Sequence, residues 1–127
     1  MKNRAVLLTL SALAVAALQT GCSGKADKDL TYQANIKPIL DANCVSCHVP
    51  GGAGYEKSGL RLDSHEAIMK GTKFGAVVVP GSSVSSTMYR LVSGQADPSI
   101  RMPHGAASLP DADVATIAAW IDQGAKN

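Results

Sequence analysis

Five consecutive residues, Cys44-Val45-Ser46-Cys47-His48, constrain this chain more than any other feature of its sequence. Two thiols three residues apart can form thioethers with the two vinyl groups on one side of a porphyrin. A histidine directly after the second cysteine can present its imidazole to the iron, and we expect its other ring nitrogen to donate to a backbone carbonyl. The motif therefore predicts one covalently attached haem c, bound through Cys44 and Cys47 and ligated by His48.

Three other uses of the cysteine pair remain open at this stage. A thiol–disulfide site of the thioredoxin type accompanies a βαβ pattern, which this sequence lacks. A zinc site needs four ligands, and these would be Cys44, Cys47, His65 and His104, although a second close pair of ligands is missing. A structural disulfide between the two cysteines needs no further residue.

The first 21 residues have the pattern of an export signal. Two basic residues precede an apolar run at 5–18, which is short for a membrane span because about 20 apolar residues are needed. The following pair Gly21-Cys22 resembles the lipobox of bacterial lipoproteins, although Gln19 stands where a leucine-like residue is usual. Cleavage before Cys22 would leave a lipid on its thiol, whereas ordinary cleavage nearby would leave a soluble periplasmic protein.

These patterns divide the chain into three parts. We expect a lipoprotein-type signal peptide at 1–21, a polar tether at 22–30 and a monohaem domain at 31–127. The expected location is the periplasmic side of a bacterial membrane. That compartment is oxidising, so free neighbouring thiols would not persist there unless they were bonded to something.

The composition favours haem among the uses of the cysteine pair. The 127 residues include one Trp, one Phe and three Tyr. A core with so few aromatic rings is marginal by itself, and a buried porphyrin would supply the missing apolar surface. The chain has 12 basic and 10 acidic residues, and the leader contains two of the basic ones, so the remainder is neutral. Neutrality argues against nucleic-acid binding, which needs an excess of positive charge.

Hydrophobic periodicity and capping residues predict a small all-α domain with long loops. A helical pattern at 32–40 contains Pro38, so the helix begins near this proline or is kinked there. The other expected segments are a glycine-rich loop at 50–58, a helix at 64–70 stopped by Gly71, a buried extended segment at 77–79, a helix that follows 82–86 and runs through Val92, a long loop at 95–109 and a last helix from Pro110 to Gly124.

The distal ligand is a separate question, because haem used for electron transfer usually keeps its iron six-coordinate. The side chains able to bind there are Met69, Met88, Met102, His65 and His104. We favour Met102 because it lies in the long loop, where the proline that follows it restricts it to extended backbone. Met69 and Met88 lie on expected helices, where packing explains them. His104 or an open site is the alternative, and both histidines are otherwise expected to be solvated.

Beyond the motif, the sequence resembles the class I c-type cytochromes, and in particular their planctomycete-type domain. The matching stretches follow one another in family order and cover nearly all of 32–125: they are 36–40 before the motif, 59–64, 79–81, 101–103, 109–111 and 119–125. The pieces Leu60 to Ser64 and Arg101 to Pro103 make the match specific.

The resemblance implies an all-α cytochrome c fold in which the first and last helices cross near the haem. It also implies His48 as the proximal ligand and Met102 as the distal ligand. Two positions depart from the family pattern. Val49 stands where a glycine commonly follows the haem histidine, and His104 stands where a second proline often follows the Met-Pro pair. Neither departure removes a ligand.

Some charged residues allow more than one interpretation. Arg61 and Arg101 would suit the haem propionates, but a structural or solvated role explains them equally well. Lys57, Lys70 and Lys73 would form a docking rim for a partner, which the neutral charge of the chain supports only weakly.

These observations predict a membrane-tethered carrier of single electrons between periplasmic redox proteins, and not an enzyme by itself. The carboxylates are spread along the chain and suggest no acid–base pair. Three alternatives stay open: a haem-based sensor or ligand-binding module with a labile sixth position, the electron-entry subunit of a larger oxidoreductase, and an exported thiol–disulfide protein. We expect neither a small-molecule substrate nor a nucleic-acid partner.

Overall fold

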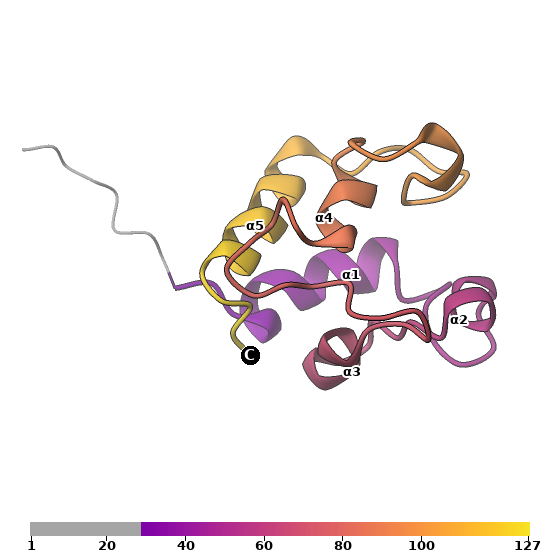
Figure 1. The fold of residues 1–127 in the computed structure, drawn as a ribbon, viewed down its shortest axis with the longest axis horizontal. Coiled ribbons are helices and arrows are strands. Elements are labelled where there is room, and N and C mark those ends of the chain that lie inside the picture. Colours follow the sequence, from indigo (N-terminus) through magenta and orange to yellow (C-terminus); the bar gives the residue numbers. More distant parts are fainter. Residues whose placement is uncertain (1–28) are drawn as a thin grey trace, which may run out of the picture.

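The computed structural model describes residues 29–127, so the predicted leader and Cys22 lie outside the described residues. The elements in this range are η1 Tyr32–Ile36, α1 Lys37–Asn43, α2 Ala53–Ser58, α3 His65–Lys70, α4 Thr87–Val92, η2 Pro98–Ile100 and α5 Asp111–Asp122 (Figure 1). Within 29–127 there is no strand, and a single isolated bridge joins Thr72 and Gly75. The expected all-α fold is confirmed. None of the helices described is long and apolar enough to cross a membrane.

The first helix accommodates its proline by changing its hydrogen-bond pattern. Thr31 caps η1 by accepting a hydrogen bond from the Ala34 amide at 3.2 Å. η1 is a π-helical turn, in which the Lys37 amide donates to the Tyr32 carbonyl. Pro38 then lies in the first turn of α1, where its missing N–H costs little. The helix is therefore continuous from η1 into α1, and its α-helical part begins beside Pro38.

The core lies where the first and last helices cross. η1 and α4 both contact α5. The side chains buried completely at this crossing come from η1, α1 and α5, and they are Tyr32, Ile36, Leu40, Ile117, Trp120 and Ile121. This crossing confirms the packing expected for the terminal helices. Figure 1 shows α2 and the loop after α4 at the other end of the domain, away from this crossing.

The C-terminal residues close over the crossing. The Lys126 carbonyl accepts the Tyr32 amide at 2.9 Å and the Trp120 indole N–H at 2.7 Å. The His65 ring lies edge-on to both aromatic rings, with centroid separations of 5.7 and 6.2 Å, and its Nε2 is 2.7 Å from the Ala125 carbonyl oxygen. The expectation of a solvated imidazole is therefore wrong for His65, which is half-buried.

The short helices in the middle of the chain lie where their capping residues predict them. Ser64 accepts a hydrogen bond from the Ala67 amide at 3.2 Å, and Gly71 ends α3 with a φ of 78°. The segment 77–79 is extended chain outside any sheet, with its first two valines buried and the third 41% exposed. The long loop at 95–109 contains only the short helix η2.

The segment 50–58 is not the glycine-rich loop that its composition suggests. α2 occupies most of it, and the Tyr55 amide donates to the Cys47 carbonyl at 3.0 Å. A Cβ at Gly52 would lie 2.5 Å from that carbonyl oxygen. The glycine therefore serves a close approach of the chain to the cysteine motif, and not the flexibility of a loop.

Candidate haem site

The cysteine motif forms a tight turn directly after α1. Cys44 is the C-terminal cap of the helix, and its amide donates to the Leu40 carbonyl at 2.8 Å. The carbonyl of Cys44 accepts the amides of Cys47 and His48, both at 3.1 Å. Hydrogen bonds to α1 and within the turn therefore fix the backbone of all three motif residues.

The two thiols have different surroundings. Cys44 is half-buried and packs against the core, whereas Cys47 is exposed, and they form no disulfide with each other. Burial, with a smaller effect of Cys47, raises the pKa of Cys44 to about 11. A redox-active thiol needs a lowered pKa and a positive environment. The geometry therefore gives no support to the thiol–disulfide alternative.

His48 has a buried nitrogen without a partner. Among the described residues only two buried side-chain polar atoms make no hydrogen bond, and Nδ1 of His48 is one of them. The expected bond to a carbonyl is therefore not formed at Nδ1. Burial lowers the pKa of His48, and the nearby backbone of Leu60 raises it by a smaller amount. Leu60 makes no hydrogen bond to Nδ1. A neutral imidazole suits a metal ligand.

α2 lies directly against the His48 ring. A Cβ at Gly54 would lie 2.7 Å from Cε1 and 2.8 Å from Nε2 of His48, closer than side chains approach one another. On its other side, the His48 carbonyl accepts the Leu62 amide at 3.0 Å. The ring keeps this position only because residue 54 is glycine. The signal for Gly54 in the sequence is the group of three glycines at 51, 52 and 54 soon after the motif, which does not by itself predict this contact.

The loop at 95–109 supplies the second part of the site. The Met102 amide donates to the Leu91 carbonyl in α4 at 3.1 Å, and its side chain is half-buried against the core. Cys44, Val45 and Leu60 are also apolar, half-buried and packed on the core. Both segments that hold predicted ligands thus offer apolar surface that a flat porphyrin would cover. Together with the neutral imidazole of His48, these residues fit haem.

The other candidates for the distal ligand are less suitable. Met88 is only 7% exposed within the core, and Met69 packs against the core from α3. Nε2 of His65 is already engaged with the Ala125 carbonyl. His104 is exposed, as expected for a solvated side chain.

The zinc alternative and one of the arginine alternatives are also decided by the geometry. Residues 29–127 contain no group of three or more His, Cys, Asp or Glu side chains that could hold a metal ion, so the four-ligand zinc site is not formed.

Arg61 makes two contacts with Asp63, at 2.6 and 3.2 Å, and this hydrogen bonding lowers the pKa of Asp63. Arg61 is thus engaged locally, whereas Arg101 is exposed and forms no ion pair within the described range.

Comparison with known proteins agrees with this geometry. The family model described as Planctomycete cytochrome C matches residues 44–104, a range that includes the cysteine motif and Met102. Cytochrome c6 of Picosynechococcus sp. is 31% identical over 90 residues, and the alignment covers 70% of each chain. The chain belongs to the c-type cytochromes. No solved structure matches this cytochrome.

Membership of this family has two direct consequences. The cytochrome binds haem c covalently, and it is a haem-based electron carrier. Its helices form the small all-α fold of a cytochrome c.

Proposed function

We propose that this cytochrome carries single electrons between periplasmic redox proteins by means of one haem. The haem would be attached through Cys44 and Cys47 and ligated by His48 and Met102. The observation that supports this proposal most directly is the turn directly after α1 that holds Cys44, Cys47 and His48 at the haem c spacing, within the range that matches the family model. Burial lowers the pKa of His48, which favours the neutral imidazole that a metal ligand requires.

Bound haem supplies a one-electron iron couple. The protein's contribution is to hold its own residues in place around that couple. The two cysteines lie on a turn fixed to α1, and Gly54 allows α2 to press on the His48 ring. Met102 is presented by a loop tied to α4 through the Leu91 carbonyl. His48 and Met102 would thus hold the iron from two separately fixed segments of the chain.

The spectral test uses the haem-loaded protein. Haem that stays with the chain on a denaturing gel, together with a low-spin six-coordinate spectrum and a sulfur-to-iron band after oxidation, is the expected result. Met102→Ala should keep the stain, lose the sulfur band, lower the midpoint potential and let the reduced protein bind carbon monoxide, because Met/His ligation raises the potential. Met69→Ala, which removes another half-buried methionine, is the matched control.

Two results would contradict the assignment. An unchanged spectrum and potential in Met102→Ala would remove Met102 from the site. Rapid binding of carbon monoxide by the unmodified reduced protein would indicate an open sixth position, as in a haem sensor.

We further propose that segment 1–21 exports the chain and that Cys22 bears a lipid, which tethers the domain through 22–30. The support is the sequence pattern around Cys22. Cys22→Ser should move the haem-containing protein from the membrane fraction to the soluble periplasmic fraction without changing its spectrum. Wild-type protein found in the soluble fraction would contradict the tether and leave a soluble periplasmic carrier.

A further inference from the structure

The helix α2 lies against His48 without a buried side chain of its own. None of its six residues is buried, so hydrophobic packing contributes little to its position. The helix nevertheless approaches the imidazole so closely that only glycine fits at position 54. A helix this short is not stable by itself. Hydrogen bonds to the rest of the chain must therefore hold α2 in place.

The first turn of α2 is held by the chain next to His48. The Tyr55 amide donates to the Cys47 carbonyl at 3.0 Å, and the Gly52 amide donates to the Val49 carbonyl at 2.8 Å. These two bonds tie the start of the helix to the residues on either side of the histidine. The last turn, which ends at residue 58, is held by different contacts.

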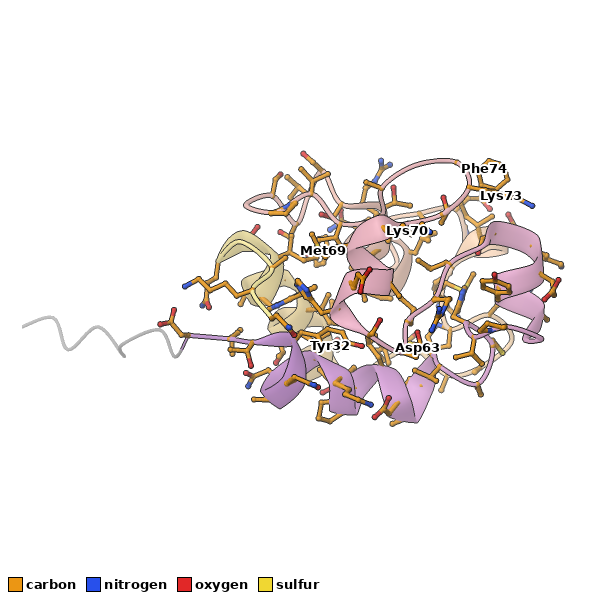
Figure 2. All side chains as sticks on the ribbon, turned by 90° about the horizontal axis from the view of Figure 1, so that it is seen from below. Tyr32, Asp63, Met69, Lys70, Lys73 and Phe74 are labelled. Atoms are coloured by element: carbon orange, nitrogen blue, oxygen red, sulfur yellow. The ribbon has the colours of Figure 1, made fainter. Side chains whose placement is uncertain are left out.

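Ser58 makes three hydrogen bonds at the end of α2. Its hydroxyl donates to the Gly54 carbonyl at 2.6 Å and accepts the Leu60 amide at 3.1 Å. Its own carbonyl accepts the Lys73 amide at 2.9 Å. Figure 2 shows Lys73 and Phe74 beside this helix, at the edge of the molecule. One half-buried residue thus joins the last turn of α2 to two other segments of the chain.

The hydroxyl of Ser58 also joins the two segments that contact His48. Gly54 lies against the imidazole ring. Leu60 begins the segment that returns to the motif, where the Leu62 amide donates to the His48 carbonyl at 3.0 Å. The ring and the backbone of His48 are therefore held by two segments that meet at a single atom, Oγ of Ser58.

Another hydroxyl shows what such a bond does away from the site. Thr116 in α5 donates to the Ala112 carbonyl at 2.8 Å, with the same spacing of four residues as between Ser58 and Gly54. Bonds of this kind within a helix are common and add little to its stability. Ser58 differs because its hydroxyl also accepts an amide from beyond the end of its helix.

We propose that Ser58 is a positioning residue for the haem ligand His48, and that its hydroxyl keeps the surroundings of the imidazole closed to solvent. This proposal rests on the proposed function and deepens it. The shell around a metal site controls the access of water, and thereby the potential of the metal. Water near the imidazole would stabilise the oxidised iron, which carries more positive charge. Ser58 would thus raise the midpoint potential of the haem.

The test uses the haem-loaded protein and removes one helical hydroxyl at a time. Ser58→Ala should lower the midpoint potential and change the NMR shifts of the His48 ring protons in the reduced protein. Ser58→Thr keeps a hydroxyl at this position and should restore both quantities to their wild-type values. Thr116→Ala is the matched control, because it removes a hydroxyl with the same bond from α5, and it should change neither quantity.

The wild-type protein provides a measurement that needs no substitution. The Leu60 amide lies beyond the end of α2, and its partner is the Ser58 hydroxyl. If this bond persists in solution, hydrogen exchange at the Leu60 amide should be about tenfold slower or more than in an unstructured peptide. NMR of the reduced, haem-loaded protein measures this rate.

Each other outcome is decisive. Exchange of the Leu60 amide at the rate of an unstructured peptide would overturn the proposal, even if Ser58→Ala failed to fold. Equal potentials in Ser58→Ala and Thr116→Ala would overturn it as well. A Ser58→Thr protein with the potential of Ser58→Ala would show that the hydroxyl is not what matters at this position. Wild-type protein that takes up no haem would instead contradict the proposed function.

Discussion

The close approach of Gly54 to His48 makes one residue decisive for the site. In an open helix, Gly→Ala stabilises a protein by about 0.5–1 kcal/mol because alanine is the better helix former. Here the added Cβ would lie 2.7 Å from Cε1 of His48, so the ring or α2 has to shift. We expect Gly54→Ala to lower both the haem content of the purified protein and its unfolding temperature. The absorbance ratio of haem to protein and a thermal melt measure the two effects.

Ala53 provides the comparison on the same helix, because it is exposed and its substitution by serine should change neither quantity. A Gly54→Ala protein with full haem content and a higher unfolding temperature would show that α2 does not press on the ring in the loaded protein.

Cys44 should show a pH dependence of its own in protein prepared without haem. Its pKa of about 11 lies above the value of roughly 8.5 for a free cysteine. Since the thiolate is the reactive form and a raised pKa delays its formation, alkylation by iodoacetamide should be slow at neutral pH. The rate should climb until the pH passes about 11. Mass spectrometry of the Cys44 peptide follows the reaction, and a midpoint at the free-thiol value would contradict the burial of this side chain.

Among the elements, α4 is joined to the extended segment before it by the Met88 amide, which donates to the Val77 carbonyl at 3.0 Å, and by the buried hydroxyl of its cap Ser86. Ser86 is completely buried, and its Oγ accepts the Val79 amide at 2.8 Å and donates to the Ser82 carbonyl at 2.9 Å. Ser86→Ala would leave the Val79 amide without its partner, which should cost about 1–3 kcal/mol of unfolding free energy. Urea unfolding measures this loss. The exposed neighbour Ser85 is the control, and an equally large loss in Ser85→Ala would mean that the buried bonds do not matter.

The elements also show which parts of the fold a sequence can predict. α3 lies where expected because its cap Ser64 and its stop Gly71 are local signals. The sequence predicts a loop in place of α2 because Gly52 and Gly54 resemble flexible chain, whereas their role is tertiary contact with the motif. His65 was expected in solvent because its partner, the Ala125 carbonyl, is 60 residues away. Contacts of that range leave no periodic or capping signal in the sequence.

The candidate site also has one part that the sequence predicts and one part that it does not. The cysteine–histidine motif was predictable because thioether chemistry and iron ligation require a fixed spacing. The half-buried position of Met102 and its bond to the Leu91 carbonyl depend on how a long loop returns to α4, which spacing alone does not determine.

At the scale of the whole molecule, the two ends of the domain depend on haem to different degrees. The crossing of η1, α1 and α5 is completely buried by protein side chains. The other end consists of the short helix α2 and the long loop at 95–109, with half-buried apolar residues on both candidate segments (Figure 1). A group that binds only the folded state stabilises the region it contacts and raises the free energy of opening there.

Protein made with the double substitution Cys44→Ser and Cys47→Ser should therefore lose order mainly at this second end. Amide hydrogen exchange is expected to become fast at Met102, while Ile117 and Ile121 in α5 stay protected, since their helix is packed without haem. Thermal unfolding should begin at a lower temperature than in the haem-loaded wild type. If the Met102 amide exchanged equally slowly with and without haem, protein contacts alone would hold the loop. Haem would then contribute nothing to the stability of this end of the domain.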